Sequence, residues 1–409
     1  MQPNGLIAIQ PWMTDPRTGR VLDALRDAGI TARFVGGCVR DSLCGRPVGD
    51  VDLAIDRPPE AASKALAAAR IKVVPTGIKH GTITAVSAGR PFEITTLRRD
   101  VETDGRRAVV AFTDDWRADA TRRDFTMNAL FCDADGNLWD FFGGRDDLAA
   151  GRVRFVGDAA MRIEEDVLRI LRFFRFHAWY GRPPFDAEGF AACRAAADKL
   201  RKLSAERVRK EMLKLLEADD PVPTVEAMAQ AGVLRHWLPE YGGVDVLRIV
   251  VGNERAVSDV DGLRRLAALI GTGGIASVVA KRLRLSTQES LRLTVMLATE
   301  PVMEVAGGTA AVRRQVYQMG NALYIDVLML LAGVGDAAWD AAHRLATTWT
   351  APDRPISGGD VLSRGVPAGR RVGRLVDAVE RWWIAQDFVP DRAACLAELQ
   401  RRIDAGEGT

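Results

Sequence analysis

The sequence has few of the residues that bind metals through nitrogen or sulfur. It contains 5 cysteines and 4 histidines among 409 residues. No two cysteines have Cys-x-x-Cys spacing and no histidine adjoins an aspartate, so neither a zinc motif nor a metal-dependent phosphohydrolase domain is indicated. The odd number of scattered cysteines also gives no disulfide framework. The thiols are therefore expected to be reduced, as in the cytosol.

Long apolar runs are lacking as well. No stretch reaches the length needed to cross a membrane, and the N-terminus has no basic-then-apolar leader, which predicts a cytoplasmic protein without a membrane partner. Hydrophobic residues make up 47% and charged residues 27% of the chain, as in ordinary globular proteins. The net charge is only +2, so an RNA partner would have to meet local basic patches.

A glycine pair stands between a strand-like run and a helix-compatible segment within residues 34–55. Gly36 and Gly37 allow bare backbone N–H groups to approach an anion, and a helix start favours negative charge. Alone, such a pair is usually only a turn. Together with an acidic pair at a fixed distance, it indicates a site for a phosphate and its metal.

The acidic pair follows the glycines at the start of a second apolar run. In a strand, residues i and i+2 share a face, so Asp50 and Asp52 would stand side by side while Val51 and Leu53 enter the core. Two carboxylates held that close repel each other, and a hard divalent cation relieves the repulsion. An isolated Asp-x-Asp is nevertheless common in loops.

The combination resembles the signature of the DNA polymerase β nucleotidyltransferase superfamily. More narrowly, residues 36–41, Gly-Gly-Cys-Val-Arg-Asp, followed by Asp50-Val-Asp52 are similar to the bacterial class II CCA-adding enzyme and poly(A) polymerase family. The resemblance implies that Asp50 and Asp52 bind two Mg²⁺ ions. It assigns the phosphates of a nucleotide to Gly36, Gly37 and Arg40.

A further acid and a polar segment follow. In the strand-like run at residues 92–96, Glu93 and Thr95 share the face opposite the apolar side chains. Glu93 is a candidate third catalytic acid, or else a salt-bridge partner of Arg98. Apolar periodicity disappears over residues 97–120, which predicts a polar loop. In the resembled family, a flexible loop at this point helps to switch the site from C to A addition.

Residues 122–129, Arg-Arg-Asp-Phe-Thr-Met-Asn-Ala, are similar to the second signature of that family. Read as a helix, the segment buries Phe125 and Ala129, and by itself it could be an ordinary capped helix. The resemblance implies that Arg123 touches the ribose or phosphates of the nucleotide. It implies that the sugar is braced by Asp124 and Asn128.

A helical pattern over residues 164–176 places four charged side chains on one face at intervals of three, namely Asp166, Arg169, Arg172 and Arg175. A surface helix stitched by ion pairs would look the same. Glu165-Asp166-x-x-Arg169 resembles the nucleobase-binding signature of the family. A carboxylate can accept from the exocyclic amine of C or A, and an arginine can donate to a ring nitrogen of either. The resemblance adds Arg172 and Arg175 for base and triphosphate.

The remaining sequence is mostly helical in pattern. Arg207 and Glu211 resemble the last signature of the family, and their i, i+4 spacing indicates a structural pair that braces the helices. Several basic residues are equally well read as RNA contacts or as solvated helix faces. They are Lys281, Arg282, Arg284, Arg313, Arg314, Arg370 and Arg371.

The chain is too long for one core, so several domains are expected. Strand-like runs in the first part and a helical pattern in the rest give the fold class, α+β. The resemblance implies a polymerase-β-like nucleotidyltransferase head with a small mixed sheet over residues 1–148. A helical neck with the base-reading residues would span 149–216, and a helical body and tail that bind tRNA would span 217–409.

The implied activity is CCA addition to the 3′ end of tRNA, whose acceptor arm is the expected partner, from CTP and ATP with Mg²⁺ as cofactor. A poly(A) polymerase of the same family is the nearest alternative. Residues 76–82, Thr-Gly-Ile-Lys-His-Gly-Thr, lack the Gly-Arg-Arg-Phe-like stretch of those enzymes. A catalytically inactive RNA-binding protein is the alternative of another class, and the intact acidic pair disfavours it.

Overall fold

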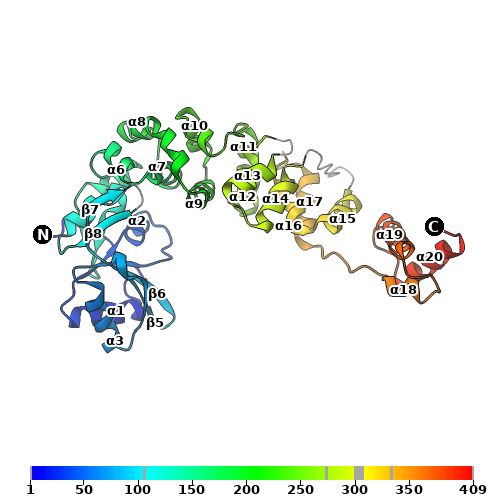
Figure 1. Cartoon of the computed structure of the whole chain (residues 1–409), viewed down its shortest axis with the longest axis horizontal. Helices are drawn as coiled ribbons and strands as arrows, with labels where there is room; N and C mark the ends of the chain where they lie inside the picture. The colour runs from blue at the N-terminus through cyan, green and yellow to red at the C-terminus, as the bar shows by residue number, and fades with distance from the viewer. Residues whose placement is uncertain (1, 105–106, 272–274, 299–307, 332–334, 408–409) are drawn as a thin grey trace. The chain divides into compact units, whose positions relative to one another are not determined.

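The structure is a computed structural model whose contacts divide the chain into two compact units (Figure 1). Unit 1 comprises Met1–Tyr241 with Arg282–Arg284, and unit 2 comprises Gly242–Lys281 with Leu285–Thr409. The head and neck expected from the sequence both fall in unit 1. The structure describes residues 2–104, 107–271, 275–298, 308–331 and 335–407.

A mixed sheet of eight strands forms the first part of unit 1, and it confirms the mixed sheet expected from the sequence. The strand order is β1-β10-β9-β2-β3-β6-β5-β4, in which β3 and β6 run parallel and the other neighbours run antiparallel. The strands are β1 (Gly5–Leu6), β2 (Ala32–Val35), β3 (Asp52–Ile55), β4 (Lys72–Gly77), β5 (Thr82–Ser87), β6 (Arg90–Thr96), β9 (Leu130–Cys132) and β10 (Asn137–Asp140).

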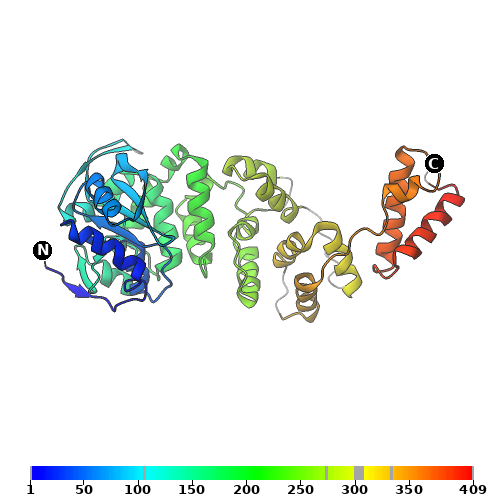
Figure 2. The same cartoon turned by 90° about the horizontal axis from the view of Figure 1, so that it is seen from below.

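Alternating side chains give the sheet two apolar faces. Phe34, Leu53 and Ile94 are buried in one core cluster together with residues of α1 and α3. Figure 2 shows α1, in dark blue, lying across the strands. On the other face, Val35 and Ala54 join a second cluster with residues of α4. The helices of this part are α1 (Pro16–Asp27), α2 (Gly37–Leu43), α3 (Pro59–Ala68), α4 (Trp116–Thr121) and α5 (Gly144–Ala149), with the short turns η1 (Ile78–His80) and η2 (Thr126–Asn128).

Two local predictions in the head were wrong. The expected loop over residues 97–120 contains an antiparallel pair, β7 (Arg98–Asp104) and β8 (Arg107–Phe112). The two strands pair only with each other, so no apolar alternation of a core strand marks them in the sequence. The expected helix over residues 122–129 is instead a connection between α4 and β9 whose one helical turn is η2. Phe125 and Ala129 are buried, as predicted.

The neck is helical and packs around aromatic side chains. Phe125 of the head contacts Phe155, Phe173 and Phe176, with ring centroids 4.9 to 6.3 Å apart. The predicted continuous helix over 164–176 is broken at Asp166, whose backbone is extended. The neck helices are α6 (Ala159–Glu165), α7 (Leu168–Tyr180), α8 (Ala187–Ala195) and α9 (Ala205–Leu216), with the turn η3 (Ala197–Lys202). The remaining elements of unit 1 are α10 (Val222–Gln230) and η4 (Leu234–His236).

Unit 2 is helical throughout its described residues, as predicted. None of the helices described in the chain is long and apolar enough to span a bilayer. The helices are α11 (Asp245–Val257), α12 (Gly262–Ala268), α13 (Ala276–Leu283), α14 (Thr287–Met296), α15 (Gly308–Met319), α16 (Asn321–Met329), α17 (Ala337–Thr348), α18 (Gly358–Leu362), α19 (Arg370–Ala385) and α20 (Arg392–Asp404).

Candidate active site

The glycine pair forms the sharp connection between β2 and α2. Gly36 has φ +70° and ψ −119°, a conformation that costs little only for glycine. Its N–H donates to the carbonyl of Leu130 on β9. A Cβ atom on Gly36 would lie 3.7 Å from Arg123 Nη1, and one on Gly37 would lie 3.7 Å from Arg40 Nη2. The turn therefore brings two of the predicted phosphate-binding arginines beside the glycines.

The acidic residues meet at the start of strand β3, beside its parallel neighbour β6. The register of β3 and β6 places Asp52 opposite Glu93, so their side chains share one face. Val51 and Leu53 are buried, as predicted, although the strand begins at Asp52 and Asp50 precedes it. Burial, followed by the charges of Glu93 and Asp50, raises the pKa of Asp52 to about 6. The three acids therefore repel one another at one place.

The three acids have little to balance them, although the charge of Arg123 favours the ionised form of Asp52. No hydrogen bond or ion pair in the described part of the chain engages the carboxylates of Asp50, Asp52 or Glu93, so the alternative salt bridge from Glu93 to Arg98 does not form. Within the described ranges, no group of three or more His, Cys, Asp or Glu side chains is placed to hold a metal ion. Hard divalent cations accept water and substrate phosphates beside one or two carboxylates, so this smaller donor set still fits such an ion.

Residues of the second signature form a buried chain of hydrogen bonds. Asn128 Nδ2 donates to Asp124 Oδ1 at 3.0 Å, and Arg172 Nε of α7 donates to Asp124 Oδ2 at 2.7 Å. Arg40 Nη1 donates to Asn128 Oδ1 at 2.7 Å. Burial alone would raise the pKa of Asp124, but Arg172 and Asn128 lower it to about 2. The chain links α2, η2 and α7 through an ionised carboxylate.

Arg123 is held by an acid that the sequence did not single out. Its Nε and Nη2 atoms donate to Asp119 Oδ2 at 3.1 and 2.9 Å. The same carboxylate binds Arg122, and its side chain is nearly inaccessible. Asp119 therefore fixes the guanidinium of Arg123 beside Gly36. Asp119 lies on α4 and is four residues before Arg123, and this spacing is the signal that could have identified it.

The predicted base-reading residues lie at the junction of α6 and α7. Asp166 occupies the break, where its Oδ1 accepts from the N–H of Leu168 at 3.1 Å. Its Oδ2 accepts from Arg207 Nη2 of α9 at 2.7 Å. Arg169 binds Glu165 and donates to the carbonyl of Arg122 at 3.0 Å. Asp166 and Arg169 are thus adjacent, but each carries a separate set of partners.

Arg207 and Glu211 brace the helices, as predicted, but they do so without pairing with each other. Each residue instead binds the neck helix α7 or its N-terminal junction. Glu211 lies 2.9 Å from Arg175 Nε and 3.7 Å from Arg172 Nη1, whereas Arg207 binds Asp166. One face of α9 therefore carries counter-ions for three predicted nucleotide-binding residues.

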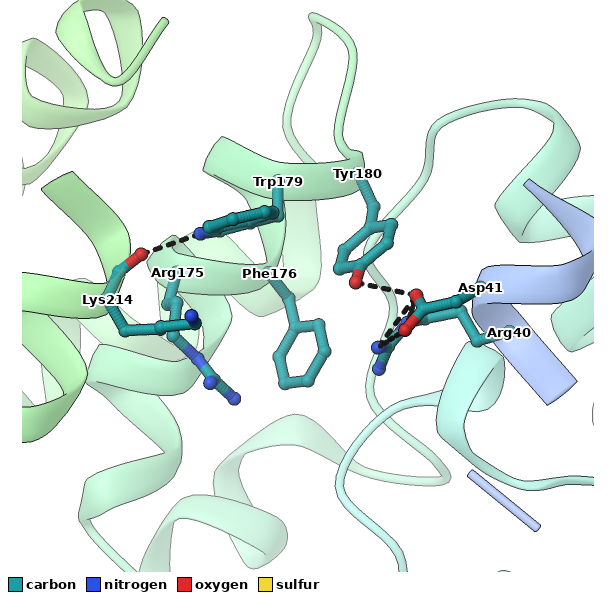
Figure 3. Close-up of a pocket in the computed structure, with 7 residues that line it drawn as sticks. All are labelled: Arg40, Asp41, Arg175, Phe176, Trp179, Tyr180 and Lys214. Atoms are coloured by element: carbon teal, nitrogen blue, oxygen red, sulfur yellow. Dashed lines mark hydrogen bonds and ion pairs between the residues drawn. The ribbon is translucent and has the colours of Figure 1, made fainter. Parts of the chain in front are cut away.

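A cavity of about 300 Å³ joins the head to the neck. Arg40 and Arg175, which the sequence assigned to one nucleotide, both line it, as Figure 3 shows. Tyr180 donates its hydroxyl to Asp41 Oδ1 at 2.8 Å, and Trp179 donates its indole N–H to the carbonyl of Lys214 at 2.6 Å. The cavity is lined by Arg40, Asp41, Arg175, Phe176, Trp179, Tyr180 and Lys214.

Several of these lining residues were missed in the sequence. The three-to-four-residue spacing from Arg172 through Arg175 extends to Trp179, so helical periodicity could have included it. No local pattern would have found Lys214, because it comes from α9 and meets α7 only in the folded chain.

Two segments of the chain match protein-family models. Residues 32–154 match the poly A polymerase head domain, and residues 185–242 match the probable RNA and SrmB-binding site of polymerase A. The mitochondrial CCA tRNA nucleotidyltransferase 1 of Danio rerio is 34% identical over 90% of this chain and 87% of its own length. The CCA-adding enzyme of Levilactobacillus brevis is 31% identical over 93% and 96%.

This chain belongs to the CCA-adding enzyme and poly(A) polymerase family. The fold agrees. The crystal structure of the Bacillus stearothermophilus CCA-adding enzyme in complex with CTP covers 96% of this chain and 99% of its own, with 26% identity and a TM-score of 0.78. Nucleotidyltransferases of the polymerase β type generally use divalent metals, which suits the carboxylates of β3.

The basic residues that the sequence offered for RNA differ in how firmly this family member holds them. Arg282 binds both carboxylate oxygens of Glu240, Arg284 binds Glu206, and Arg313 binds Asp387. Arg371 donates to the carbonyl of Glu407 at 3.3 Å. The side chains that are exposed are those of Lys281, Arg284, Arg314 and Arg370. RNA contact by any of the seven stays a prediction.

Proposed function

We propose that this RNA nucleotidyltransferase adds C, C and A to the 3′ end of tRNA, with CTP and ATP as substrates. The observation that carries the proposal is the register of β3 and β6, which places Asp52 opposite Glu93, with Asp50 adding a third negative charge. Unbalanced acids beside a glycine turn suit the transfer of a nucleotidyl group from a triphosphate. Relatives named for CCA addition match over nine-tenths of the chain, which supports the same substrate class.

Asp50 and Asp52 would hold Mg²⁺, with Glu93 as the third acid of the group. When bound, Mg²⁺ lowers the pKa of the attacking 3′-hydroxyl and neutralises charge on the triphosphate. Arg123, fixed by Asp119, would contact phosphate or ribose next to Gly36. Gly36 and Gly37 leave room there that a larger residue would take.

Arg40 and Arg175 would serve the triphosphate from the wall of the shared cavity. The Nη atoms of Arg175 point into this cavity (Figure 3). Its Nε lies 2.9 Å from Glu211. Arg40 keeps the buried contacts to Asn128 and Asp41, so its guanidinium is held in one orientation. Asp124 and Asn128 would brace the sugar only through this same chain of hydrogen bonds.

Base choice would fall to Asp166 and Arg169 at the start of α7, assisted by Arg172 and Glu165. A carboxylate acceptor and a guanidinium donor match the amine and ring nitrogen of C and A. U and G would leave a polar group unpaired, which costs about 1–3 kcal/mol. The exposed arginines of the helical part would contact the tRNA backbone, and the cytoplasmic location expected from the sequence stays a prediction.

The decisive experiment is incorporation of labelled nucleotides into tRNA that lacks its 3′ terminus, with each of the four nucleotides offered separately and then together. We expect Mg²⁺-dependent addition that stops after three nucleotides. A long A tail would make the chain a poly(A) polymerase, and no incorporation would indicate an RNA-binding protein without catalysis.

A further inference from the structure

The carboxylate of Asp166 is oriented by a backbone N–H of α7 and by a side chain of α9. The residue sits in the extended break between α6 and α7, so no helical backbone limits its rotamer. The N–H of Leu168 binds Oδ1, and Arg207 Nη2 binds Oδ2 at 2.7 Å. A carboxylate has about four acceptor sites, so two remain for a base. The direction in which these two point depends on both contacts.

Of these two partners of Asp166, only Arg207 contributes a side chain, so it can be substituted without removing a backbone group. It lies on α9, and its contact with Asp166 joins two segments that are far apart in the sequence. Both side chains are 30% exposed. At that exposure the pair adds little to stability, because solvent screens it. A guanidinium fork nevertheless fixes the plane of the carboxylate it binds.

We propose that Arg207 is a positioning residue that sets base selectivity by fixing the carboxylate of Asp166. The inference rests on the proposed function, in which Asp166 accepts from the exocyclic amine of C or A. Without Arg207, the carboxylate turns about χ1 and χ2, and its acceptor leaves the place where the amine arrives. A turned carboxylate accepts a water instead, so the penalty for U and G falls while the metal-binding acids are untouched.

The experiment measures the ratio of kcat/KM for CTP to that for UTP on tRNA lacking its terminus. We compare the full-length wild type with Arg207→Met, Arg207→Lys and Asp166→Ala, and with the double variant of Arg207→Met and Asp166→Ala. Lys210→Ala, an exposed change on the same helix, is the matched control. Arg207→Lys keeps the charge, and a melting temperature for each variant reports folding.

We expect Arg207→Met to lower the ratio about tenfold, and Arg207→Lys to restore part of it. In the Asp166→Ala background, Arg207→Met should have no further effect, because coupled residues are not additive. Lys210→Ala should leave the ratio unchanged. If Arg207→Met does not fold, Arg207→Lys carries the test, and its ratio should lie below that of the wild type.

Three results would overturn the inference. An equal loss for CTP and UTP would make Arg207 merely structural. Additive effects with Asp166→Ala would mean that Arg207 acts on the nucleotide by itself. An unchanged ratio in both Arg207 variants would refute positioning while the Asp166 assignment survives. Should Asp166→Ala also leave the ratio unchanged, the base-reading part of the proposed function fails, and the positioning role fails with it.

Discussion

Two groups of charged side chains in this chain are arranged in opposite ways. At the start of the central strand β3 in the head, Asp50, Asp52 and Glu93 gather with no ion pair among the described residues. In unit 2, Glu254 is fully buried and binds Arg265 at 2.6 Å and Arg264 at 2.8 Å. The first group has no ion-pair partner and only the nearby charge of Arg123 to offset it, whereas the second supplies its own counter-charges.

The unit 2 cluster continues through further matched pairs. Asp326 of α16 binds Arg264 at 3.1 Å and Arg292 of α14 at 2.8 Å. Arg292 also binds Asp261 at 3.0 Å, where it helps to lower the pKa of that carboxyl against its burial. Four helices are therefore tied by charges that cancel. Buried charges that cancel serve the fold, whereas acids gathered around the partly buried Asp52 without an ion-pair partner fit a divalent cation.

The largest effect should come from removing the unbalanced charge. Asp52→Asn should reduce nucleotide incorporation on the order of 10³-fold, because the metal loses its most buried ligand. Labelled CTP and tRNA lacking its terminus measure the change. Asp23→Asn, an exposed acid on α1, is the control and should leave the rate unaffected. Full activity of Asp52→Asn would remove the functional half of the comparison.

Breaking the balanced cluster should instead cost stability. Arg265→Met leaves Glu254 buried with one partner fewer, which should destabilise unit 2 by about 3–5 kcal/mol. Hydrogen exchange of peptides from α11, α12 and α16, read by mass spectrometry, measures the loss. Adding Glu254→Gln to the Met variant should recover part of it, since the uncompensated charge is gone. Unaltered protection in Arg265→Met would mean that the cluster is not structural.

The acids at β3 should also make the free energy of unfolding depend on pH. The raised pKa of Asp52 means that the metal-free fold is penalised once this carboxyl ionises. The stability from neutral Asp52 is complete below pH 3.8 and is lost as the pH rises through about 6. In EDTA at pH 7, Asp52→Asn should therefore be more stable than the wild type by on the order of 2–3 kcal/mol. Urea unfolding at pH 4 should show almost no difference, and an equal gain at both pH values would contradict the assignment.

The smallest effect is expected at an exposed pair. Arg284 binds Glu206 with 69% of its side chain accessible, so Arg284→Ala should change the free energy of unfolding by less than about 1 kcal/mol. The same variant tests the RNA prediction. A weaker tRNA affinity with a reduced salt dependence would assign Arg284 to the RNA, and an unchanged affinity would leave it as a solvated ion pair.

The sequence predicted what depends on neighbours along the chain. Gly36 and the acids of β3 were found because a turn and an alternating strand need only local spacing. The pairing of Asp52 with Glu93 needs a parallel register between strands that are separated by α3, β4 and β5. Spacing suggested Glu93 as a third acid, but only the folded sheet puts it opposite Asp52.

The neck illustrates why other features were missed. The helical pattern runs through Asp166 without interruption, yet the carboxylate binds the N–H of Leu168 and ends α6 there. Arg207 was paired with Glu211 by spacing, although Arg207 binds Asp166 in the break before α7 and Glu211 binds Arg175 on α7. Arg264 and Arg265 look like solvent-facing residues by composition, and only tertiary packing buries them.

The short strand β3 leaves this chain little freedom in length. Its side chains alternate between the two faces of the sheet: Asp52 shares a face with the buried Ala54, while Leu53 and Ile55 enter the core on the other face. Glu93 of β6 lies in register with Asp52. Deleting or inserting one residue within Asp52–Ile55 would swap the two sides, bringing Leu53 to the nucleotide and driving a carboxylate among aliphatic groups. A change of length at this strand would therefore disturb the apolar core and the catalytic acids together.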